Sequence, residues 1–258
     1  MARIIIVMLI ALSNPQLQES KKTDLGKAFL KIENPFDADK VQYLDSIKTS
    51  DLSRFLLSSE HISENGIIGS KYRRIQVHIH SVSKDKNNPL KYHIKGKSKV
   101  VNNITIFSGI IKFVDAVKIK AAEAEDSHTV IAAGKYKFSE PTDLAHSGVF
   151  EGTLKLQLYY NFKDKKLSLA PDLGQDGYSN RTFAGTWQDY KTKNILKCIW
   201  GLGRLPFTDD FDIGTGEMYI NKKYEHMGWK SFNERTDYFY DQELESFIEK
   251  NKWWLEQK

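Results

Sequence analysis

Apolar and polar residues alternate with a period of two over much of the chain, beginning near Ile67. In the segment Ile75-Gln76-Val77-His78-Ile79, each apolar residue is followed by a polar one or ends the run. Successive side chains of an extended strand point to opposite faces, so this pattern predicts strands with one buried face. Further strands are expected at residues 92–95, 104–112, 113–120, 130–138, 149–162, 166–169, 181–190, 195–200 and 218–220. Because no helical pattern separates them, we expect an all-β-dominated protein, either an antiparallel β-barrel or a strongly coiled β-sandwich.

Helical patterns flank the strands. Leu52, Phe55 and Leu56 have helical spacing and predict a short N-terminal helix. After Asp241, apolar residues that include Trp254 fall on one broad face and predict a C-terminal helix. We expect this helix to dock on the β-domain, with a partner-binding helix as the alternative. The expected organisation is a signal peptide (1–13), a lead-in with a short helix (14–64), a β-barrel-like domain (65–230) and the C-terminal helix (231–258).

The first residues have the pattern of an export signal. Met1-Ala2-Arg3 precedes an apolar run from Ile4 to Leu12, and small residues follow. This arrangement is typical of a secretory signal peptide, cleaved here after about Ser13. The alternative is a buried first strand, because the run is rich in β-branched residues. The sequence predicts an exported protein, periplasmic or secreted, without a transmembrane segment in the mature chain, since the run is too short to span a bilayer.

The net charge and the cysteine count restrict the kinds of partner and of cellular location to be expected. The chain has 258 residues, 38 basic and 33 acidic, with a net charge of +5. This mild excess does not indicate a nucleic-acid partner, but it leaves room for an anionic ligand. Cys198 is the single cysteine, so no internal disulfide can form. An animal extracellular protein of this size usually has several disulfides, so a bacterial exported protein is favoured.

Glycine precedes an aromatic residue by two positions in several predicted strands, as in Gly134-Lys135-Tyr136 and Gly185-Thr186-Trp187. Such pairs are typical of bends in a strongly coiled sheet, where the aromatic ring covers the glycine. The segment Phe183-Ala184-Gly185-Thr186-Trp187 resembles the G-x-W element of calycin-type barrels such as lipocalins and avidins. The segments 198–201 and 210–217 resemble uncharacterised exported bacterial β-proteins. The calycin resemblance implies an antiparallel barrel around a small hydrophobic ligand.

Five residues are candidate ligand contacts: Trp187, Tyr219, Trp229, Lys95 and Lys97. The aromatic residues can stack on a sugar or close the core. Lys95 and Lys97 belong to a basic strand face that can hold a sulfate, a phosphate or an acidic glycan. If the hairpin pairs symmetrically, His80 faces His93 near His78, which is suitable geometry for zinc. The third interpretation is a solvated sheet face.

An acidic loop is the candidate metal site. Asp210, Asp212 and Glu217 lie in a segment with two glycines, and calcium prefers several oxygen ligands around a tight backbone. We therefore consider calcium a possible cofactor. A turn held by hydrogen bonds from aspartate side chains is the alternative.

No enzyme motif stands out in the sequence. A nucleophile elbow, a zinc-protease H-E-x-x-H motif and a phosphate loop are all absent. The leading hypothesis is therefore non-catalytic binding of a small apolar molecule or a glycan. Two alternatives stay open: a hydrolase that uses acidic residues near 209–217, and an envelope structural or interaction protein that uses the terminal helix.

Overall fold

The computed structural model describes residues 43–118, 126–169, 180–215, 218–239 and 252–255. In this part of the chain, the strands are β1 (Glu64–Ile68), β2 (Arg73–Lys84), β3 (Lys91–Val100), β4 (Asn103–Lys118), β5 (Ser127–Ser139), β6 (Gly148–Asn161), β7 (Lys166–Leu169), β8 (Arg181–Asp189) and β9 (Ile195–Gly201). The helices are α2 (Leu44–Thr49), α3 (Ser53–Leu56), η1 (Lys222–Met227), α4 (Lys230–Phe239) and η3 (Trp253–Leu255).

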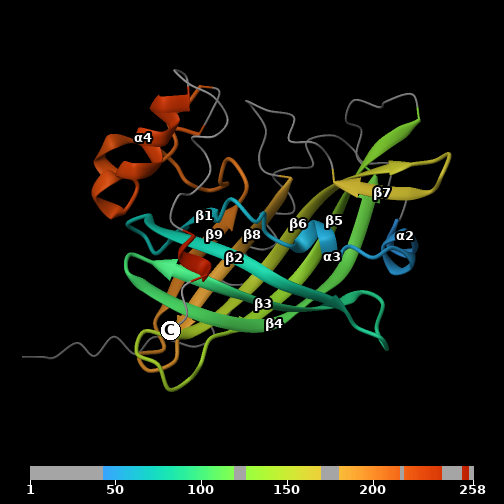
Figure 1. Ribbon diagram of the computed structural model, residues 1–258, viewed down its shortest axis with the longest axis horizontal. Coiled ribbons are helices and arrows are strands. Elements are labelled where there is room, and N and C mark those ends of the chain that lie inside the picture. Colours follow the sequence, from blue (N-terminus) through green and yellow to red (C-terminus); the bar gives the residue numbers. More distant parts are fainter. Residues whose placement is uncertain (1–42, 119–125, 170–179, 216–217, 240–251, 256–258) are drawn as a thin grey trace, which may run out of the picture.

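Eight of the strands close into an antiparallel barrel (Figure 1). The strand order is β5-β4-β3-β2-β1-β9-β8-β6, and β5 pairs with β6 to complete the ring. The short strand β7 extends the sheet beyond the end of β6. The predicted all-β fold is confirmed, and of the two expected forms the barrel is the correct one.

Two predicted strand boundaries are wrong. Residues 104–112 and 113–120 were expected as separate strands, but β4 runs unbroken from Asn103 to Lys118, with a bulge between Phe113 and Asp115. A bulge bends a strand without ending its pairing, which is how a long strand follows a curved barrel wall. The expected strand at 218–220 is only an isolated bridge between Asp212 and Ile220.

Aromatic side chains fill the middle of the barrel. Trp200 is 1% exposed and stacks on Phe183, with ring centroids 4.9 Å apart. Tyr136 lies in the same cluster, opposite Gly152 in the strand register. A Cβ atom on Gly152 would lie 2.8 Å from the Tyr136 hydroxyl oxygen and 2.3 Å from the carbonyl oxygen of Ala184. The glycine therefore leaves room for the Tyr136 side chain of the neighbouring strand. The predicted cover within one strand differs from this, since a Cβ atom on Gly134 would lie nearest to Ile111 Cγ2, at 2.9 Å.

A second apolar layer covers one outer side of the barrel. The chain after β9 packs against outward-facing residues of β1, β8 and β9, and Phe211 and Trp229 lie at its centre. Trp229 is fully buried, and its Nε1 donates to the carbonyl oxygen of Tyr72 at 2.7 Å. In Figure 1, α4 lies outside the wall beside β1 and β9.

The predicted C-terminal helix is present in part. The segment predicted as 231–258 begins with α4, at Lys230, and η3 lies against the outside of β2, where Trp254 stacks on His78. The apolar face expected after Asp241 falls outside the described residues. Within the described ranges, no helix has the length and apolar character needed to cross a membrane.

One end of the barrel is covered by the N-terminal helices. Ile47 of α2 and Leu56 of α3 join the interior cluster, which confirms the short helix predicted around residues 52–56. The first residues of two strands, Glu64 of β1 and Arg181 of β8, form an ion pair there, with Arg181 Nη2 and Glu64 Oε1 2.7 Å apart. The opposite end carries the turns that shape the candidate site.

Candidate functional site at the barrel mouth

A pocket of about 690 Å³ opens at the end of the barrel opposite α3. Four connections surround it: the β1–β2, β3–β4 and β8–β9 turns and the segment between β5 and β6. Inward side chains of β3, β6 and β8 form its deeper wall, among them Ser98, Phe150 and Trp187. The volume lies within the range of roughly 300–1,000 Å³ that is usual for small-molecule sites.

A buried carboxylate lies in this pocket and is positioned by three donors. Glu140, just after β5, is 5% exposed. Its Oε1 accepts from Ser98 Oγ at 2.9 Å. Its Oε2 accepts from Trp187 Nε1 at 3.0 Å and from the Gly148 backbone N–H at 2.8 Å. Because the donors come from β3, β8 and the start of β6, the barrel itself fixes the carboxylate.

The surroundings of Glu140 oppose its ionisation. Burial raises the pKa of its carboxyl group, and the hydrogen bonds from Trp187, Ser98 and Gly148 only partly offset this effect. Among the residues that the structure describes, no basic side chain forms an ion pair with Glu140. The group is an acceptor held in an apolar environment, a condition found at many functional sites.

The walls and the rim of the pocket differ in character. Phe150 and Leu196 give the wall apolar surface, whereas the exposed side chains of Lys71, Arg73 and His146 place basic groups at the rim. Asp189 also lines the rim, but its Oδ1 accepts from two backbone N–H groups of the β8–β9 turn. The pocket therefore combines an acidic floor, apolar walls and a basic rim.

The five predicted ligand contacts lie in three separate places. Trp187 lines the pocket. Lys95 and Lys97 point outward from β3 on the side wall. Tyr219 and Trp229 belong to the layer outside the barrel, where the Tyr219 backbone N–H donates to Asp212 Oδ1. The structure thus brings only Trp187 of these five to the pocket.

Glu140 was not among the predicted site residues. In the sequence it stands before Pro141 and reads as part of a turn between strands. The donors that hold it are separated from it in sequence and meet it only because the barrel closes. The one local signal is the alternation of β5, in which Glu140 follows Tyr136 and Phe138 at every second position and therefore points to the core.

The predicted pairing of His80 with His93 is wrong. Ile79 pairs with Gly96 and Ser81 with Lys95, so His80 is the extra residue of a β-bulge. His93 bonds instead to Asp85 Oδ2 at 2.8 Å. Burial, together with the neighbouring His80, lowers the pKa of His78 to about 4. The three histidines therefore do not converge on a zinc-binding geometry.

The described carboxylates of the predicted calcium loop bond to protein donors. Asp210 accepts from Tyr224 Oη at 2.8 Å and pairs with Lys223, whose hydrogen bond lowers the pKa of the Asp210 carboxyl group. Asp212 accepts from the backbone N–H groups of Gly214 and Tyr219. Glu217 lies outside the described residues. Within the described ranges, no group of three or more His, Cys, Asp or Glu residues is placed to hold a metal ion.

The fold and the pocket define a class: a closed eight-stranded antiparallel barrel, consistent with the calycin resemblance, with a small-molecule-sized pocket at one end. No protein-family model, no curated protein and no solved structure matches the chain. The likeness to exported bacterial β-proteins therefore stays a prediction.

The buried carboxyl group predicts a pH dependence of stability. Because the pKa of Glu140 is higher in the folded than in the unfolded protein, the folded state binds more protons above pH 4.5, the ordinary value. The contribution of the Glu140 carboxyl group to the free energy of unfolding therefore falls as the pH rises from 4.5 through the raised pKa. The fall is at most about 1.4 kcal/mol per pH unit. Across this range, urea unfolding should show the free energy of unfolding of the wild type fall relative to that of Glu140→Gln, whose side chain does not titrate. The exposed Glu60→Gln is the control, and an equally flat difference for both variants would contradict the prediction.

Proposed function

We propose that this protein is a non-catalytic carrier or receptor that binds a small, largely apolar molecule in the mouth of the barrel. The observation that carries this proposal is the buried carboxylate of Glu140 in an apolar pocket of about 690 Å³. A pocket with apolar walls and a few fixed polar groups is the usual form of a small-molecule site.

The pocket chemistry indicates how such a molecule is oriented. An ionised carboxylate offers about four acceptor positions, and three donors of the protein bond to Glu140. One position is left for a hydroxyl or N–H donor of the ligand. The apolar part of the ligand would pack on Phe150 and Leu196, and an anionic substituent would meet Lys71 and Arg73 at the rim.

The filled interior limits how deep the ligand lies. Phe138, Phe183 and Trp200 occupy the middle of the barrel, directly below the pocket wall formed by Phe150. A ligand therefore binds at the mouth, above this aromatic layer, rather than along the whole barrel axis. This differs from the ligand position that the calycin resemblance implies.

Anilinonaphthalene sulfonate is a suitable first probe, because it combines an N–H donor, apolar rings and an anionic group. We expect it to bind the wild type saturably, and Val100→Trp, which fills the pocket from its wall, to weaken binding about tenfold or more, as the loss of a few apolar contacts would do. Fluorescence titration measures both affinities.

The control is Ile213→Trp, which places the same large side chain at a 52% exposed position in the chain after β9, away from the pocket. It should leave the affinity of the pocket unchanged. Equal loss in both variants, or binding that never saturates, would overturn the proposal. Native mass spectrometry of protein purified from its own source then identifies the natural ligand, because a bound molecule is released on unfolding.

Export is the second part of the proposal. The apolar run after Arg3 and the small residues near Ser13 support a cleaved signal peptide and a periplasmic or secreted location. These residues lie outside the described part of the chain. Sequencing the N-terminus of the mature protein tests the proposal, and a mature chain that begins at Met1 would contradict it.

A further inference from the structure

The outer face of β4 carries a row of exposed apolar side chains. Ile106, Ile110 and Val114 are 56%, 38% and 45% exposed. They alternate with Phe107, Ile111 and Phe113, which face the barrel core, so the row points away from the interior. Ser108 and Lys112 lie between them on the same outward face. Because single exposed apolar side chains are common on protein surfaces, the row indicates an interaction surface only together with the charges around it.

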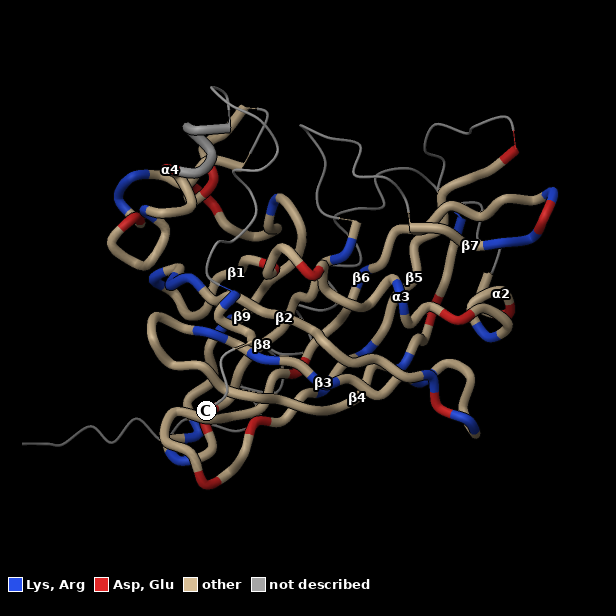
Figure 2. The backbone as a smooth tube through the Cα atoms, in the orientation of Figure 1, with Lys and Arg blue, Asp and Glu red and all other residues tan. Residues whose placement is uncertain are grey.

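Lysines flank this row on both sides. On the β3 side, Lys97 pairs in register with Ile106, and Lys95 with Ser108. On the β5 side, Lys137 pairs with Ile110. Lys112 continues the face on β4 itself and is exposed. We call this face, made of Ile106, Ile110, Val114, Lys95, Lys97, Lys112 and Lys137, the β4 surface. Figure 2 shows the basic positions along these strands in blue.

The described acidic residues near the β4 surface are fewer than its four lysines: Glu151 of β6 lies opposite Lys137 in register, and exposed Asp115 follows Val114 on β4. Asp85 at the β2–β3 turn is engaged by Lys91 and His93, at 2.6 and 2.8 Å. The charges of Lys97 and Lys95 are felt on the adjoining strand β2. Burial first, and these two charges second, lower the pKa of His80. The face is therefore positively charged around an apolar centre.

We propose that the β4 surface docks the protein on the surface of an anionic lipid membrane. Lysine side chains can rest their apolar stems among lipid headgroups while the ammonium groups meet phosphates. The isoleucines would enter the apolar part of the interface between them. A soluble acidic polymer would meet the lysines but leave Ile106 and Ile110 in water. A protein partner is less favoured, because a row one strand wide gives little apolar core for a stable interface.

Vesicle sedimentation tests the proposal without reference to the pocket. The wild type should bind vesicles of phosphatidylcholine with phosphatidylglycerol and should not bind vesicles of phosphatidylcholine alone. Lys95→Gln with Lys137→Gln should weaken binding by about fivefold for each charge removed, the factor that corresponds to about 1 kcal/mol. Ile106→Ser with Ile110→Ser should weaken it about tenfold, through lost burial of apolar area.

The controls make equivalent changes elsewhere. Lys163→Gln with Lys166→Gln removes two exposed lysines at the β6–β7 turn, and Ile213→Ser removes a 52% exposed apolar side chain of the outer layer. Both should bind vesicles like the wild type, and circular dichroism confirms that all variants are folded. No binding to anionic vesicles would overturn the proposal. A loss with the lysine variant alone, together with retention on heparin, would also overturn it and assign the surface to an acidic polymer.

Discussion

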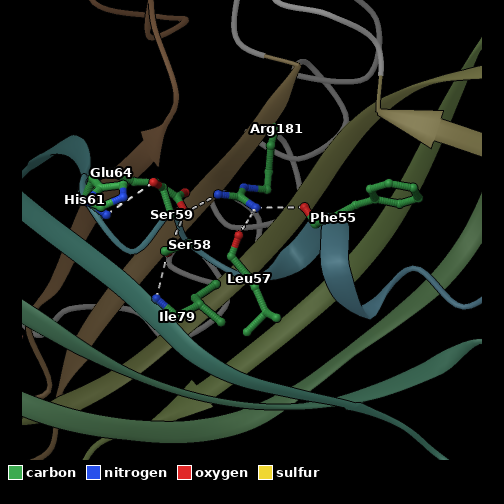
Figure 3. Close-up of polar contacts among 8 residues, drawn as sticks. All are labelled: Phe55, Leu57, Ser58, Ser59, His61, Glu64, Ile79 and Arg181. Carbon is green, nitrogen blue, oxygen red and sulfur yellow. Dashed lines mark hydrogen bonds and ion pairs between the residues drawn. The ribbon is translucent and has the colours of Figure 1, made fainter. Parts of the chain in front are cut away.

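Replacing Arg181 with methionine is expected to lower the free energy of unfolding by about 3–5 kcal/mol, the usual cost of breaking one side of a buried ion pair. The side chains of Arg181 and Glu64 are 4% and 0% exposed. Without Arg181, the Glu64 carboxylate would keep a hydrogen bond from Ser58 Oγ but no cation. The carbonyl oxygens of Phe55 and Leu57 would each lose the donor that now lies at 2.7 Å (Figure 3).

Urea unfolding of the variant measures this effect. Adding Glu64→Gln to Arg181→Met should recover part of the loss, because no unpaired charge then remains buried. Lys48→Met is the surface control: its partner Asp45 is 92% exposed, and exposed pairs contribute about 0–1 kcal/mol. A change for Arg181→Met as small as that of Lys48→Met would show that the buried pair does not hold this end of the barrel.

Trp200→Ala should have a comparable effect, a loss of about 3–5 kcal/mol. The Trp200 ring is 1% exposed and meets four aromatic neighbours. It stacks on Phe183, contacts Tyr136 and Phe150 edge-on at 5.4 and 5.7 Å, and lies 6.5 Å from the Phe138 ring. Its removal leaves a cavity in the middle of a closed barrel. Strands paired on both sides cannot move inward far enough to fill the cavity, so the lost contacts are not replaced.

Thermal and urea unfolding of the purified variant give the value. Trp200→Phe keeps an aromatic ring at the position and should lose less stability than Trp200→Ala. Phe162→Ala removes an aromatic ring that is 48% exposed and should change stability by no more than about 0.5 kcal/mol. If Trp200→Ala lowered the free energy of unfolding as little as Phe162→Ala, the aromatic layer would not be the main source of stability in the barrel.

The local pattern of the sequence was enough to predict most strands, because each strand has one face in the core. The bounds of β7 and the start of β8 agree with the prediction. The pattern did not reveal that β4 is continuous, since a bulge near Phe113 shifts the alternation in the same way as a strand end. It also did not reveal where the β2–β3 turn lies, which pairs His93 with Ser83, nor the bulge at His80, which shifts the pairs beyond it by one more residue.

The candidate site was less accessible from sequence than the fold. Trp187 was found through its resemblance to a known barrel element and does line the pocket. Glu140 was missed because its role depends on Ser98 and Trp187, which reach it from other strands. Such a site is a property of the closed barrel, and periodicity along one strand carries no information about which strands meet.

The closure of the barrel has a consequence for how the chain unfolds. Every other strand pair of the barrel joins consecutive strands or, for β6 and β8, strands separated only by β7 and its connections, but the β1–β9 pair joins residues 65–68 to residues 198–201. We call the β1–β9 pairing the closing seam of the barrel. It pairs only four residues of each strand, and bringing strands so far apart in sequence together has a high entropic cost. Arg181 of β8 and Glu64 of β1 bond across β9 and so clamp the seam from both sides. We expect this pair to form late in folding, because it needs the ring to be closed, and mutations of Arg181 should then change the unfolding rate more than the folding rate.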